Sequence, residues 1–154
     1  MTATARAHGT AGDRPPRALV LDTNIVLDLF VFDDVRTQPL KAQLQEGHCT
    51  WLATAPMREE LERVLGYAHI EARLGTAGQS AADVLASFDR HALLVDVAEL
   101  APVACADPDD QLFIDLAVRH QCALLSKDAA VLTRKKKLAA LQVEVGAVIS
   151  APYS

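Results

Sequence analysis

Short apolar runs alternate with segments of helical periodicity along most of this chain. The apolar runs that predict strands lie at 18–21, 49–54, 92–97, 122–125 and 143–149. Segments with apolar residues three and four positions apart predict helices that begin near residue 25 or span 38–46, 57–65, 79–91, 111–120 and 128–140. Strands that alternate with helices favour an α/β fold, in which helices cover both faces of a parallel sheet.

The length and composition indicate one domain. A chain of 154 residues can bury one core and leaves little room for two. Residues 1–16 lack an apolar stretch, so we expect a flexible tail there and a single domain over residues 17–154. Charged residues interrupt the apolar runs before they reach the length of a membrane span. The 3 cysteines lie far apart, which favours a reducing, cytoplasmic setting.

The net charge limits how this protein could meet nucleic acid. It is −5, from 15 Lys and Arg against 20 Asp and Glu. This balance argues against a protein that binds nucleic acid over its whole surface, because such binding needs many cations. A local basic patch at Arg134, Lys135, Lys136 and Lys137 could still contact RNA. A solvated helix face explains the same run equally well.

Carboxylates stand where the predicted strands end and the helices begin. Asp22 directly follows the strand at 18–21, and Asp128 closely follows the strand at 122–125. Asp107, Asp109 and Asp110 precede the helix at 111–120, at the same end of the sheet. Ligands of open parallel sheets bind at the carboxyl ends of the strands, so these acids are candidates for a site. Each one taken alone is also an ordinary helix cap.

Glu60 differs from these acids because it lies within a predicted helix. It borders the apolar stripe of the helix at 57–65, whereas Glu59 and Glu62 point towards solvent. A glutamate at this border can reach a cleft. Carboxylates gathered at one place raise one another's pKa values unless a cation joins them. Mg²⁺ or Mn²⁺ would fill that role and could activate water for attack on a phosphate.

Four segments carry a family resemblance in their order and spacing. They are Val20-Leu-Asp-Thr-Asn24, Glu60-Leu-Glu-Arg-Val-Leu65, Asp107-Pro-Asp-Asp-Gln-Leu-Phe-Ile-Asp-Leu-Ala117 and Leu124-Leu-Ser-Lys-Asp128. Together they resemble the successive motifs of PIN-domain ribonucleases over roughly residues 17–153. The nearest subgroup is that of the toxins in toxin–antitoxin pairs. The resemblance implies a three-layer α/β/α sandwich with a central parallel sheet, and metal-dependent hydrolysis of RNA.

The resemblance also implies roles for individual residues. The four catalytic acids would be Asp22, Glu60, Asp110 and Asp128. All of these except Glu60 would bind Mg²⁺ or Mn²⁺, and Asp107 would be a further ligand. The supporting residues would be Asn24, which would orient Asp22, and Ser126, which stands where the family usually has threonine. The partners expected from the resemblance are RNA, a small antitoxin protein and a second copy of the chain.

Two other functions remain open at this stage. A phosphatase of the haloacid dehalogenase type also begins with an aspartate after its first strand, but it needs a second aspartate where Asn24 stands. A PIN-like module that binds without catalysis is the other alternative. Trp51 and Phe113 could stack a nucleic-acid base. Their positions within a strand and a core helix make packing the better interpretation.

Overall fold

The computed structural model of the protein describes residues 16–149. The predicted tail at 1–16 lies outside this range except for its last residue, as do residues 150–154 of the predicted domain. The elements are β1 (Arg17–Leu21), α1 (Thr23–Phe30), η3 (Val35–Thr37), α2 (Gln38–Gln45), β2 (Cys49–Ala53), α3 (Ala55–Leu65), α4 (Ala68–Thr76), α5 (Ala81–His91), β3 (Ala92–Leu94), η4 (Pro108–Asp110), α6 (Gln111–His120), β4 (Ala123–Leu125), α7 (Ala129–Leu132), α8 (Lys135–Ala139) and β5 (Val145–Gly146). Within residues 16–149, no helix has the length and apolar character that crossing a bilayer requires.

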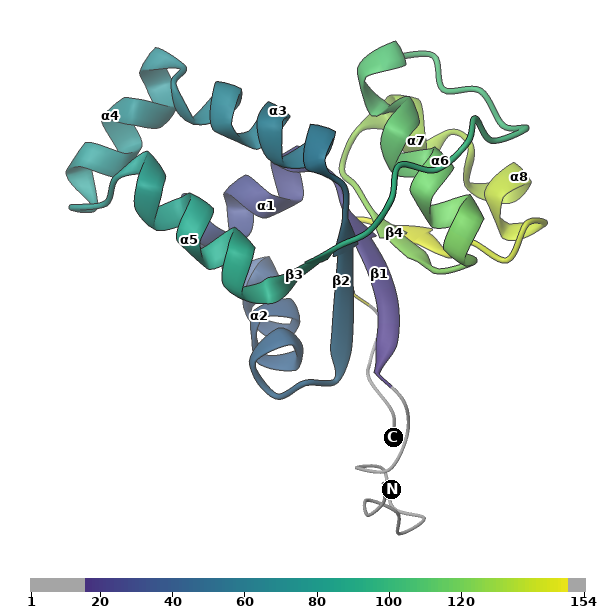
Figure 1. The fold of residues 1–154 in the computed structure, drawn as a ribbon, viewed down its shortest axis with the longest axis horizontal. Coiled ribbons are helices and arrows are strands. Elements are labelled where there is room, and N and C mark those ends of the chain that lie inside the picture. The colour runs from purple at the N-terminus through teal and green to yellow at the C-terminus, as the bar shows by residue number, and fades with distance from the viewer. Residues whose placement is uncertain (1–15, 150–154) are drawn as a thin grey trace, which may run out of the picture.

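The five strands form one parallel sheet in the order β3-β2-β1-β4-β5. Helices α1–α5 lie on one side of this sheet and α6–α8 on the other (Figure 1). The predicted three-layer α/β/α fold is therefore confirmed. Strands β1 and β4 are neighbours although most of the chain separates them. The connection that follows β1 runs towards one edge of the sheet, and the connection that follows β4 runs towards the other edge. Open parallel sheets bind ligands at such a switch point.

The central strand β1 lies within the hydrophobic core. Leu19, Val20 and Leu21 are almost fully buried, as expected for a strand covered on both faces. Trp51 and Phe113 are each only 1% exposed, so both pack in the core as predicted. The Trp51 ring meets the Phe88 ring edge-on at 5.0 Å between centroids.

Three predicted elements were wrong in extent. The helix expected at 128–140 is two short helices, α7 and α8, and this break accompanies complete burial of both Val131 and Leu138. The strand expected at 143–149 is only β5, whose register covers just Leu124 and Leu125 of β4. The strand expected at 92–97 is only β3, which ends at Leu94, the residue that pairs with the last residue of β2.

Helix α4 was not predicted. Ile70 and Leu74 are its only buried residues, and one apolar pair is too short a stripe to signal a helix. The chain turns from α3 into α4 at Gly66 and Tyr67.

Candidate metal centre

The carboxyl ends of β1 and β4 bring Asp22 and Asp128 to the switch point. The backbone N–H of Asp22 donates to the carbonyl of Leu125 at 3.1 Å, which ties the two strand ends together. Asp22 caps α1 by accepting from the N–H of Ile25 at 3.0 Å, and Asp128 caps α7 by accepting from Ala130 at 2.9 Å. Each cap bond uses only Oδ1, so a capping role and a metal-binding role are compatible.

Ser126 connects the two acids. Its hydroxyl is fully buried and donates a hydrogen bond to Oδ2 of Asp22. Oγ of Ser126 also accepts a hydrogen bond from the backbone N–H of Asp128 at 3.0 Å. A single small side chain therefore orients Asp22 and fixes the start of the segment that carries Asp128.

Three further carboxylates form a cluster beside Asp22. One oxygen from each of Asp107, Asp110 and Asp128 lies within 4.8 Å of the others. Oδ2 of Asp110 is buried and has no hydrogen-bond partner in the described part of the chain. Asp109 is exposed and is not a member of this group, which distinguishes it from Asp110.

The electrostatics of this cluster are unfavourable for negative charge. Burial, the adjoining Asp128 carboxyl and the charges of Asp107 and Asp22 raise the pKa of Asp110 to about 7. Burial also raises the pKa of Asp22, and the charge of Asp128 adds to this effect. Hydrogen bonds from Ser126 and from the N–H of Ile25 act in the opposite direction, as does the nearby charge of Lys127.

These residues fit a hard divalent cation. The cluster offers only carboxylate oxygens, and Asp110 keeps a buried oxygen that has no partner among the described residues. A cation there would satisfy that oxygen and offset the repulsion that raises its pKa. We therefore assign Asp107, Asp110 and Asp128 as the residues that could hold such an ion, with Asp22 adjacent to them.

Glu60 reaches the same region from α3. Its Oε2 accepts a hydrogen bond from the hydroxyl of Thr23 at 2.6 Å, and its Oε1 lies 3.9 Å from Arg63. A cleft of about 220 Å³ has Asp22, Glu60 and Asp110 in its lining, so three of the four predicted catalytic acids meet there. The fourth, Asp128, joins them through its cluster with Asp110.

Size alone would not have located this cleft. A larger cavity of about 520 Å³ lies where α1, α2, α4 and α5 meet, and none of the predicted acids lines it. Sequence reasoning missed Thr23, although it belongs to the same motif as Asp22. A hydroxyl beside the first acid was the available signal.

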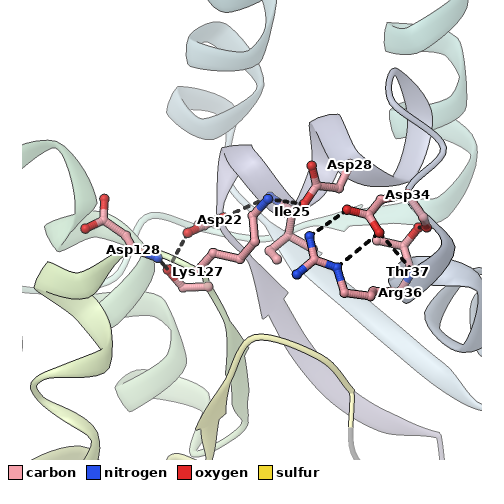
Figure 2. A network of polar contacts seen from close by, with 9 residues as sticks. Asp22, Ile25, Asp28, Asp34, Arg36, Thr37, Lys127 and Asp128 are labelled. Carbon is pink, nitrogen blue, oxygen red and sulfur yellow. Dashed lines mark hydrogen bonds and ion pairs between the residues drawn. The ribbon is translucent and has the colours of Figure 1, made fainter.

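A second missed contact is the ion pair between Lys127 and Asp28. Nζ of Lys127 lies 2.5 Å from Oδ2 of Asp28, which is 7% exposed. Figure 2 shows the Lys127 side chain extending from beside Asp128 past Asp22 towards α1. The pair fixes one positive charge close to the acid site, where it favours ionised Asp22.

The structure places the other predicted residues less decisively. Asn24 is exposed at the cleft, and the hydrogen bonds to the Asp22 side chain come from Ser126 and from the N–H of Ile25. Arg134 is half-buried, and its Nε is buried without a partner among residues 16–149. Lys135 and Lys136 are exposed on α8. The RNA contacts expected from these three residues stay a prediction.

Fold and site together define an α/β domain that gathers carboxylates at the switch point of a parallel sheet. The family model of the PIN domain matches residues 18–143, and the chain belongs to that family. The PIN domain is a nuclease-type fold, so the family and the acid cluster point to the same chemistry. A search of curated proteins found no match.

Proposed function

We propose that this protein is a metal-dependent endoribonuclease that hydrolyses phosphodiester bonds in RNA. The observation that carries the proposal is the acid cluster of Asp107, Asp110 and Asp128 beside buried Asp22, at the switch point of a PIN domain. The chain needs no side-chain nucleophile for this reaction. Water attacks the phosphorus, and the bond to the leaving ribose oxygen breaks.

The residues of the cleft would have two different roles, metal binding and orientation of water. Asp22, Asp107, Asp110 and Asp128 would hold Mg²⁺ or Mn²⁺. When bound, the ion would supply a Lewis acid that stabilises the charge developing on the phosphate. Glu60 has Oε2 committed to Thr23, so its Oε1 can accept a hydrogen bond from the attacking water and orient it.

The finer parts of the proposal rest on the resemblance to the toxin subgroup. The protein would then be the toxin of a toxin–antitoxin pair and would act in the cytoplasm. Its partners would be a small antitoxin that covers the acid cleft and a second copy of the chain. Exposed Lys135 and Lys136 would contribute phosphate contacts beside the site.

The test compares two adjacent aspartates. Purified protein is incubated with single-stranded RNA in Mg²⁺, Mn²⁺ or EDTA, alongside Asp110→Asn and Asp22→Asn. Exposed Asp109→Asn is the matched control, since it removes the same charge one residue away. We expect metal-dependent cleavage that falls more than about 100-fold in the first two variants, because even the outer partners of metal ligands contribute 10–100-fold. The control should retain cleavage.

Other outcomes separate the alternatives. Equal cleavage by all variants would refute the site. Release of phosphate from a small phosphomonoester, without RNA cleavage, would favour a phosphatase. Absence of cleavage together with absence of Mn²⁺ binding in calorimetry would favour a binding module.

A further inference from the structure

Two aromatic side chains line the acid cleft and have no part in the reaction proposed above. Tyr67 and His69 contribute to its lining, together with the apolar residues Leu27 and Val64. The cleft therefore combines carboxylates with an aromatic and apolar surface. A metal site alone would not require that surface.

Among the Phe, Tyr and Trp side chains of residues 16–149, Tyr67 is the exposed one. It is 46% exposed, whereas Trp51 and Phe113 are buried in the core. Its hydroxyl has no hydrogen-bond partner within residues 16–149. Its ring lies 6.4 Å from that of His69, measured between centroids, at an interplanar angle of 33°. Packing of the fold therefore leaves nearly half of this residue accessible. An exposed face of a π-system is available to another flat group.

The backbone holds Tyr67 in a defined position. It stands between α3 and α4, where its N–H donates to the carbonyl of Val64 at 3.0 Å. Its own carbonyl accepts from the N–H groups of Ile70 at 3.0 Å and Glu71 at 2.9 Å. Because the backbone is fixed, only two side-chain torsions remain to be ordered when a ligand stacks on the ring.

We propose that Tyr67, with His69, forms a base-binding subsite in which one unpaired base of the RNA stacks. The inference rests on the proposed function, because the acids would hold the phosphate adjacent to that base. The cleft of about 220 Å³ is smaller than the ~300–1,000 Å³ typical of pockets for drug-sized ligands, so it suits a single base. A base paired in a duplex is stacked between its neighbours and could not enter. Single-stranded RNA is therefore the substrate.

The experiment removes the ring from the protein and the base from the RNA. The full chain cleaves a short single-stranded RNA in Mg²⁺, and each position in turn is replaced by an abasic ribose. We expect one position near the cleaved bond at which the abasic change lowers kcat/KM by roughly 5- to 150-fold, the range for losing one base–aromatic stack. Tyr67→Ala should lower kcat/KM on intact RNA by a similar factor, mainly through KM, and should abolish the effect of the abasic change.

Two variants serve as controls. Tyr67→Phe keeps the ring and should therefore retain the effect of the abasic change that Tyr67→Ala loses. Leu100→Ala changes a side chain that is 76% exposed and lies outside the lining of the cleft, so it should change nothing.

The inference and the proposed function fail in different ways. If the protein cleaves RNA, but the abasic scan is flat or Tyr67→Ala matches the original, the subsite is refuted and the nuclease stands. If the protein cleaves no RNA, binding of a fluorescein-labelled single strand decides the inference. Equal affinities of the original protein and Tyr67→Ala would then overturn it, and a loss confined to Tyr67→Ala would support it.

Discussion

Replacing Ser126 with alanine removes a side chain that hydrogen-bonds to both strand-end acids. Its hydroxyl is fully buried, and the carboxylate of Asp22 that it serves is 2% exposed. A hydrogen bond to a charged group contributes about 1.5–3 kcal/mol to stability. We expect Ser126→Ala to lower the free energy of unfolding by this amount at pH 8 without metal. At about 2–4 °C per kcal/mol, the melting temperature should fall by roughly 3–12 °C.

The protein carries its own probe for this measurement. Its only tryptophan, Trp51, lies in the core, so its emission reports unfolding in urea. Calorimetry with Mn²⁺ gives the second readout, in which loss of this outer partner of Asp22 should weaken affinity by about 10–100-fold. Ser126→Thr retains the hydroxyl and should keep that affinity, although its added methyl group can cost about 1–3 kcal/mol in a packed interior.

The reasoning would be refuted by an alanine variant with unchanged stability and unchanged affinity for Mn²⁺. That result would mean that the cap bond from Ile25 alone is enough to hold Asp22. A loss of stability without a loss of affinity would assign Ser126 a structural role only.

Three further predictions concern other contacts of the site. Thr23→Val keeps the shape of the side chain but removes the donor to Glu60, so kcat should fall about 10–100-fold. The melting temperature should fall less than in Ser126→Ala, because this hydrogen bond is only partly buried, and an unchanged kcat would mean that Glu60 needs no orientation. In EDTA, stability should decrease as the pH rises from about 4 to about 7, because folded Asp110 keeps a proton that the unfolded chain has released. In thermal melts, the melting temperature of Asp110→Asn should depend less on pH than that of the original protein. The same dependence on pH in both proteins would contradict the assignment of this effect to Asp110. Lys127→Met leaves buried Asp28 without its partner and should cost about 1–3 kcal/mol in urea unfolding, between the values for exposed and buried pairs. Asp28→Asn combined with it should recover part of that loss.

The sequence predicted the part of the site that depends on strand ends. Apolar runs at 18–21 and 122–125 identified two core strands, and the parallel sheet then required Asp22 and Asp128 to share an edge. Glu60 was predicted from its place beside an apolar stripe, and its side chain does lie in the cleft. These inferences succeeded because strand ends and helix faces follow directly from local periodicity.

Contacts between distant side chains could not be predicted in this way. Periodicity assigns a residue to one face of a helix or strand but does not identify the side chain that it contacts. The hydrogen bond from Thr23 to Glu60, 37 positions away, could therefore not be predicted. The pairing of Asp28 with Lys127 was hidden for the same reason. Tyr67 was missed with α4, whose short apolar stripe gave no signal for the helix that it precedes.

The contact between Ser126 and Asp22 joins residues 104 positions apart, and this separation orders events during synthesis. A ribosome has exposed β1 long before β4 exists, so the nascent chain carries Asp22 without its hydroxyl partner and without Asp110 or Asp128. Any activity that needs these acids together is therefore withheld until nearly the whole domain has emerged. The nascent chain would therefore lack the proposed nuclease activity throughout that interval.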